Sequence, residues 1–208
     1  KISHGGRWEE TPSHAVCADI ASMTAEFSVE EKEDEIRLTT AVITLRVLRN
    51  PFCLEAFRSD GTVILQTAFD RQGTSWAYAR LNDHFVTVRQ CRHEDAFFGL
   101  GEKTGRFNRK GRNFTLWNTD VLNPNATGEF VAKHKSGDPR ADPLSTEFDP
   151  YYVSIPFFYH LPHMQSAMAG FFFDNPYRAT FEFAEVKEYR VHFHGGQYTE
   201  FVFAGPAM

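Results

Sequence analysis

The sequence predicts an all-β protein, a sandwich of mainly antiparallel strands, and three observations lead to this fold class. Apolar and polar residues alternate with a period of two in many short segments, as in strands with one buried face. Turns rich in Gly, Asn, Asp and Pro separate these segments. No amphipathic helical pattern longer than about three turns is found. Many short strands at regular spacing are typical of a β-sandwich.

The first half of the chain contains five predicted strands. A polar turn at Ser59-Asp60-Gly61 joins two of them into a β-hairpin, and a turn at Asn50-Pro51 precedes that hairpin. The predicted strands cover residues 35–40, 41–47, 52–57, 62–66 and 84–89.

The second half repeats this pattern. Pro156 falls inside one predicted strand, which is allowed only at a sheet edge or a bulge. Gly195-Gly196 separates the last two segments, in which Phe residues occupy one face and polar residues the other. An apolar segment at 167–174 is expected to be buried on both faces. The predicted strands cover residues 153–159, 167–174, 180–183, 189–194 and 198–203.

Composition indicates a single globular domain. The 208 residues suit one large β-domain, and the high content of 21 Phe favours an aromatic core. A net charge of −5 gives no basic surface for nucleic acid or an anionic membrane, and no apolar run is long enough to span a bilayer. Three cysteines in no metal-ligand spacing favour a reducing compartment. We therefore expect a cytoplasmic protein, or a secreted one if a signal peptide was removed.

The loop-rich part of the chain carries the candidate site chemistry. Residues 101–120 and 123–150 lack strand alternation, and their carboxylates are Glu102, Asp120, Glu147 and Asp149. Most of these carboxylates are expected to be solvated loop charges or turn caps. The segment WNTD at 117–120 combines an aromatic ring with amide, hydroxyl and carboxylate groups, which is the side-chain set that binds sugars. Its alternative is a buried Trp beside an Asx-type turn.

No cofactor or metal site is predicted. Gly99-Leu100-Gly101 lacks the third glycine and the helix of a dinucleotide site. His192 and His194 would share one strand face, which suits a metal, but no acidic or Cys partner is identifiable from the sequence. A solvated strand face is the favoured interpretation of this pair.

Four motifs in order along the chain carry a resemblance to a known family. They are FFGLGEKTG at 97–105 with NRKG at 108–111, TLWNTD at 115–120, DPYYVSIPF at 149–157 and FVFAGP at 201–206. Together they resemble the amino-terminal signature of glycoside hydrolase family 31. Several motifs in the correct order are far more specific than any one of them.

The resemblance implies a galactose-mutarotase-like β-sandwich, or supersandwich, over residues 1–208 that packs against a (β/α)₈ catalytic barrel. In this family the barrel supplies a nucleophilic Asp and an acid/base Asp for a retaining mechanism on α-linked glucosides. The chain ends where the barrel should begin, so we expect no catalytic residue here and no activity from this chain alone. The loop-rich segment 101–150 is expected to face the active site.

The resemblance also implies roles for individual residues. By motif position, Asp120 would be the residue that the sandwich sends into the substrate pocket, while Trp117 and Asn118 would mainly support its turn. Gly99 and Gly101 are expected to permit unusual backbone conformations or a close approach.

Glu102 completes the structural part of the motif. We expect its carboxylate to fix the loop by pairing with Arg106, Arg109 or a backbone amide.

The function implied is that of a non-catalytic domain of an α-glucosidase-type or α-xylosidase-type hydrolase that acts on an α-glucoside or oligosaccharide. A stand-alone aldose 1-epimerase-like enzyme and a carbohydrate-binding module remain alternatives. An epimerase needs a general base and acid, usually Glu and His, and no epimerase motif is recognisable. The surface that faces the barrel is expected to be unusually apolar, so the isolated chain should self-associate through it.

Overall fold

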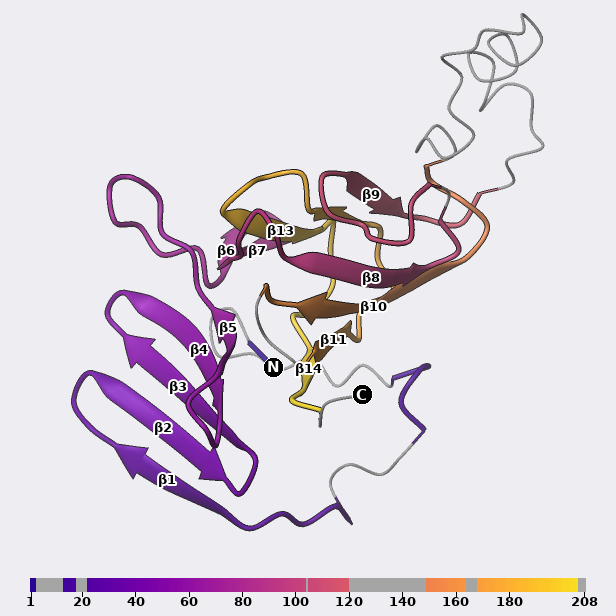
Figure 1. The fold of residues 1–208 in the computed structure, drawn as a ribbon. Coiled ribbons are helices and arrows are strands. Elements are labelled where there is room, and N and C mark those ends of the chain that lie inside the picture. The colour runs from indigo at the N-terminus through magenta and orange to yellow at the C-terminus, as the bar shows by residue number, and fades with distance from the viewer. Residues whose placement is uncertain (3–12, 18–21, 104, 120–148, 164–167, 206–208) are drawn as a thin grey trace, which may run out of the picture.

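The protein folds into three antiparallel sheets (Figure 1). The structure is a computed structural model that describes residues 1–2, 13–17, 22–103, 105–119, 149–163 and 168–205. Within these ranges there is no α-helix, which confirms the predicted all-β class. No helix of the described residues is long and apolar enough to cross a membrane.

The amino-terminal sheet is a five-stranded meander in the order β1-β2-β3-β4-β5. The predicted hairpin is confirmed, because β4 and β5 pair antiparallel. The predicted strand at 41–47 begins two residues late, since the Thr40 hydroxyl accepts hydrogen bonds from the Val42 and Ile43 amides and closes a turn there. The strands are β1 (Phe27–Glu31), β2 (Glu35–Thr40), β3 (Ile43–Arg49), β4 (Phe52–Arg58) and β5 (Val63–Gln66).

The other two sheets form the sandwich that carries the motifs. One has the order β6-β7-β13-β12-β9 and the other the order β14-β11-β10-β8. The first consists of β6 (Ala79–Leu81), β7 (His84–Gln90), β13 (Glu188–Phe193), β12 (Ala179–Glu182) and β9 (Asn113–Leu116). The second consists of β14 (Glu200–Phe203), β11 (Ala169–Phe173), β10 (Ser154–Leu161) and β8 (Ala96–Gly101). One strand, β9, therefore lies inside the segment that was predicted to be loop-rich.

Pro156 lies within β10, and the prediction of a bulge at this residue is confirmed. The pairing of β10 with β8 shifts register between Ser154 and Phe158. Proline has no N–H for the ladder, so the chain accommodates it where the pairing is interrupted.

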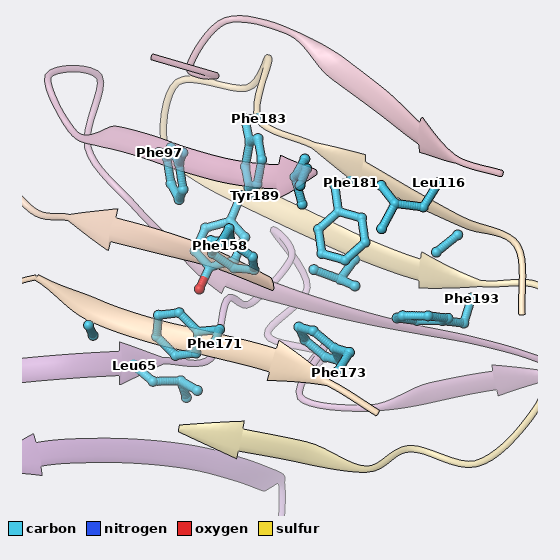
Figure 2. Packing of buried hydrophobic residues seen from close by; sticks show 14 of the residues in the cluster. Leu65, Phe97, Leu116, Phe158, Phe171, Phe173, Phe181, Phe183, Tyr189 and Phe193 are labelled. Atoms are coloured by element: carbon cyan, nitrogen blue, oxygen red, sulfur yellow. The ribbon is translucent and has the colours of Figure 1, made fainter. Parts of the chain in front are cut away.

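The core between the two sandwich sheets is largely aromatic (Figure 2). Phe158 of β10 and Phe171 of β11 stack at a centroid distance of 5.2 Å, and Phe158 meets the edge of Phe181 from the opposite sheet at 5.8 Å. Burying each such ring contributes about 1.5–3 kcal/mol. The high Phe content is thus explained mainly by the core. Among the described residues, the fully buried Phe side chains are Phe85, Phe97, Phe114, Phe158, Phe171, Phe173, Phe181, Phe183 and Phe193.

Candidate functional site

The glycine motif at the end of β8 brings two strands into unusually close contact. Gly99, Leu100 and Gly101 have φ values of 123°, 73° and 79°. Residues other than glycine rarely adopt this backbone conformation. A Cβ on Gly99 would lie 2.6 Å from the Phe157 carbonyl oxygen, and one on Gly101 would lie 2.7 Å from the Val153 carbonyl oxygen. Both glycines therefore allow β8 to lie against the irregular start of β10.

Glu102 contributes to this arrangement through its backbone. Its N–H donates to the Val153 carbonyl at 3.0 Å, while its side chain is exposed. Among the described residues, the carboxylate makes no hydrogen bond or ion pair, so the expected pairing with Arg106 or Arg109 is not seen there. The loop is held instead by Arg109, whose guanidinium donates to the carbonyls of Gly99 and Arg106 at 3.3 and 2.9 Å.

A buried lysine and an aspartate connect the two ends of the segment that lies between β9 and β10. Lys103 Nζ donates to the Thr115 carbonyl at 2.5 Å and lies 3.4 Å from Asp149 Oδ1. The other Asp149 oxygen accepts the Thr115 amide at 2.5 Å. Burial lowers the pKa of Lys103, and Asp149 partly offsets this effect. The sequence indicated Asp149 only as a loop charge or turn cap, although this residue begins the third motif, and it gave no role to Lys103.

The turn after β9 is anchored on the start of β10. The Asn118 Oδ1 atom accepts the Ser154 amide at 2.9 Å, and the Thr119 amide donates to the Tyr151 carbonyl at 3.1 Å. Trp117 is 52% exposed, which contradicts the alternative of a buried Trp. Asn118 acts as a support for the turn. Asp120, the next residue, lies outside the described residues, as does most of the 123–150 segment.

A cavity of about 400 Å³ lies beside this turn. Two of its lining residues, Leu116 and Phe193, belong to the core and are labelled in Figure 2. The described part of its lining combines aromatic rings with amide and hydroxyl groups and includes no charged side chain. The lining residues are Leu116, Trp117, Asn118, Ser154, Pro156, Asn175, Pro176, Tyr177 and Phe193.

A larger cavity of about 750 Å³ lies over β6, β7 and β13. It is lined by charged side chains, and none of the described family motif residues lines it. The charged residues are Asp70, Arg80, Glu182, Glu188 and Arg190. Glu188 and Arg190 already pair with each other at 2.6 Å. Size alone therefore does not make this cavity the candidate site.

The His pair considered for a metal has a third imidazole beside it. His84 of β7 lies across from His192 and His194, with ring centroids 4.7–5.3 Å apart and His84 Nδ1 3.2 Å from His192 Nε2. Burial lowers the pKa of His192 and His194, and the neighbouring imidazoles add to this effect. In the described part of the chain, no three His, Cys, Asp or Glu side chains are arranged to hold a metal ion.

One carboxylate–imidazole pair occurs within the described residues. His160 Nε2 lies 2.8 Å from Asp95 Oδ2, and both side chains are buried. Burial would raise the pKa of Asp95, but hydrogen bonds from His160 and from the amides of Arg92 and His163 lower it to about 2. Because neither group reaches solvent, this pair is not placed to act as the acid and base of an epimerase.

Comparison with known proteins agrees with the motifs. Residues 1–182 match the sequence model of the glycosyl hydrolase 31 N-terminal galactose mutarotase-like domain. Alpha-glucosidase 2 of Bacillus thermoamyloliquefaciens is 31% identical over 180 residues, which are 86% of this chain and 20% of that protein. Isomaltosyltransferase of Sporosarcina globispora is 23% identical over 174 residues, which are 79% of this chain and 13% of that protein.

A solved structure has the same fold over almost the whole chain. It is a glycoside hydrolase 31 dextranase of Flavobacterium johnsoniae in complex with isomaltotriose, with a TM-score of 0.73 and 25% identity. The match covers 97% of this chain and 21% of the dextranase chain. The chain thus spans about a fifth of the length of these relatives. On this evidence, the chain belongs to the N-terminal galactose mutarotase-like domain family of glycoside hydrolase family 31.

Proposed function

We propose that this chain is the non-catalytic N-terminal domain of a retaining α-glucosidase-type hydrolase that acts on α-linked gluco-oligosaccharides. In this proposal, the turn after β9 presents Asp120 to the substrate pocket. The two carboxylates that cleave the glycosidic bond belong to the rest of the protein.

Two relatives support the substrate class. One is named an alpha-glucosidase, and a dextranase was solved with isomaltotriose. Both names describe enzymes that act on, or bind, glucose units in α-linkage. The isolated chain is expected to be inactive, because in this proposal the two carboxylates that cleave the bond belong to the rest of the protein.

The observation that carries the Asp120 proposal is the anchored turn. Asn118 and Thr119 are tied to the start of β10, so the chain direction immediately before Asp120 is defined by two hydrogen bonds. Lys103 and Asp149 bond to each other, and Asp149 also accepts the Thr115 amide of β9. The two ends of the segment between β9 and β10 are therefore held together. A substrate-binding group needs such support, because a loosely held side chain loses entropy on binding.

Replacing Asp120 with Ala in the complete enzyme tests the proposal. We expect kcat/KM for α-glucosides to fall about 10- to 100-fold, as for the loss of one charged hydrogen bond to substrate, with an unchanged melting temperature. Steady-state kinetics on maltose, isomaltose and an aryl α-glucoside measure the effect.

Asp83→Ala is the matched control, because the Asp83 carboxylate is exposed. Its ion pair with Arg80 is long, with 3.6 Å between the nitrogen and the oxygen. Its kinetics should equal those of the unmodified enzyme. Unchanged kinetics in Asp120→Ala would contradict the role of Asp120.

A second part of the proposal concerns the outer face of the sheet that contains β10. Phe157, Tyr159, Phe172, Phe201 and Phe203 alternate with core residues on β10, β11 and β14, and we call them the aromatic face. Phe157 contacts Tyr159 at 4.8 Å and Phe203 at 6.1 Å, and Phe172 stacks on Phe201 at 5.8 Å. Such a contiguous apolar surface is typical of an interface.

The proposed occupant of the aromatic face is the remainder of the same protein. The match covers 20% of Alpha-glucosidase 2 and 13% of isomaltosyltransferase, so both relatives are several times as long as this chain. Packing a catalytic domain there would bury the aromatic rings and hold the β9–β10 turn in a constant orientation.

The isolated chain is therefore expected to self-associate through the aromatic face. Sedimentation velocity should detect a dimer whose affinity falls about tenfold in Phe203→Ser, because this ring is 51% exposed. Phe27→Ser on β1 is the control, because Phe27 is also exposed but lies outside the face. A strictly monomeric chain at high concentration would argue against this surface.

We further propose a cytoplasmic location. Cys17, Cys53 and Cys91 are all free thiols in the structure, which supports a reducing compartment.

A further inference from the structure

We infer that the cavity beside the β9 turn binds a glucosyl unit of an oligosaccharide, with the ring of Tyr177 as its stacking platform. This inference rests on the proposed function and extends it to a residue outside the four family motifs. It assigns the cavity to a sugar unit of a longer substrate.

The Tyr177 ring is held flat against two glycines. A Cβ on Gly195 would lie 2.5 and 2.6 Å from the Cδ1 and Cε1 atoms of the ring, and one on Gly196 would lie 2.8 Å from Cδ2. Contacts near both edges of the ring show that one of its faces covers the glycine pair. The side chain is nevertheless 54% exposed, so the other face is open to solvent.

A buried asparagine fixes the two turns that make this platform. Asn175 Nδ2 donates to the carbonyls of Gly195 and Gln197 at 3.0 and 3.1 Å, and its Oδ1 accepts the Tyr177 amide at 2.9 Å. Asn175 is 5% exposed, and both the nitrogen and the oxygen of its side-chain amide are bonded within the protein. The ring is therefore positioned before any ligand arrives, which reduces the entropy cost of binding.

The cavity offers the chemistry that a neutral sugar needs. Trp117 and Tyr177 are both about half exposed and line the same cavity, so two aromatic surfaces are available to the C–H face of a pyranose ring. The side-chain oxygen of Asn118, Oδ1, accepts the Ser154 amide, and the side-chain NH₂ group remains as a donor. Ser154 Oγ is buried and has no partner among the described residues.

Charge and size narrow the ligand class. Among the described residues that line the cavity there is no Asp, Glu, Lys, Arg or His, which favours an uncharged saccharide over a phosphorylated or acidic one. Its volume of about 400 Å³ lies within the range of roughly 300–1,000 Å³ that is usual for ligand pockets.

The position of the cavity predicts which substrates depend on Tyr177. Trp117 and Asn118 lie three and two residues before Asp120, so the cavity lies next to the proposed substrate pocket. A glucosyl unit bound there would belong to the part of an oligosaccharide away from the cleaved bond. Tyr177 should therefore contribute more to long substrates than to short ones.

The test compares substrates of different length in the complete enzyme. We measure kcat/KM for isomaltotetraose, maltotetraose and p-nitrophenyl α-glucoside in Tyr177→Ala, and express each tetraose relative to the aryl glucoside. At least one of the two ratios should fall about tenfold, the size expected for one lost ring–sugar contact. Tyr177→Phe should keep both ratios, because the aromatic face is retained.

Phe69→Ala controls for the loss of an exposed aromatic ring outside the cavity. Its ratios should equal those of the unmodified enzyme, and thermal unfolding should show that all three variants are folded. Unchanged ratios in Tyr177→Ala would overturn the inference and leave the proposed function intact. An unmodified enzyme that hydrolyses no α-glucoside would instead contradict the proposed function and, with it, this inference.

Discussion

Replacing Gly99 with Ala is expected to lower the free energy of unfolding by about 3–5 kcal/mol. The φ value of 123° is strained for any residue with a Cβ, which costs about 1–3 kcal/mol. The new methyl group would also lie 2.6 Å from the Phe157 carbonyl oxygen and 3.0 Å from the Phe158 Cα. Both neighbours are backbone atoms, so relief requires a shift of β10 against β8, and overpacking adds about 1–3 kcal/mol.

Gly111→Ala is the matched control for this prediction. Gly111 also has a positive φ of 84°, but no heavy atom lies within 4 Å of a Cβ built there. Its loss should be about 1 kcal/mol, from backbone conformation alone. Urea unfolding of both variants measures the difference, and equal losses would show that the close contact with β10 does not matter. Because Ser154 at the start of β10 holds Asn118, we also expect Gly99→Ala to disturb the turn before Asp120.

Replacing Arg89 with Met should destabilise the chain by about 3–5 kcal/mol, because it leaves a buried carboxylate unpaired. Arg89 is 2% exposed, lies over the rings of Phe171 and Phe173, and pairs with Glu200 at 2.5 Å. Without the guanidinium, the remaining Glu200 charge is desolvated, and the Tyr198 hydroxyl at 2.6 Å is its remaining hydrogen-bond donor among the described residues.

Two further variants separate the charge effect from simple loss of packing. Arg49→Met removes a pair with Glu31 in which both side chains are well exposed, and it should cost at most about 1 kcal/mol. Combining Arg89→Met with Glu200→Leu removes both buried charges and should recover most of the lost stability. A double variant as unstable as Arg89→Met would mean that the ion pair itself, rather than the orphaned carboxylate, stabilises the core.

Local pattern was sufficient for much of the fold. Strand β2 and the β4–β5 hairpin occur where alternation and turn residues predicted them, and the register shift of β10 occurs at Pro156. These features depend on interactions between residues that are close in sequence. The strand β9 was not predicted, because a segment of four residues among Gly, Asn and Arg has too few positions to display a period.

The candidate site was predictable only in part. The ordered motifs identified the turn at Trp117 and Asn118, and the glycines of β8 have the backbone geometry that their role requires. The family motifs gave no indication of Tyr177. Its platform combines turns around residues 175–177 and 195–197, and an asparagine links them only after both have folded.

Alternation by itself determined that the chain forms strands, and the ordered motifs determined its family. The tertiary structure alone decided which strands share a sheet. β13 and β14 are neighbours in sequence on either side of Gly195-Gly196, yet they pair in different sheets. Alternation also left open whether Arg89 or its neighbours face the core, because a period of two distinguishes two faces without saying which is buried. That choice depends on Glu200 and Tyr198, more than a hundred residues away, whose side chains complete the ion pair.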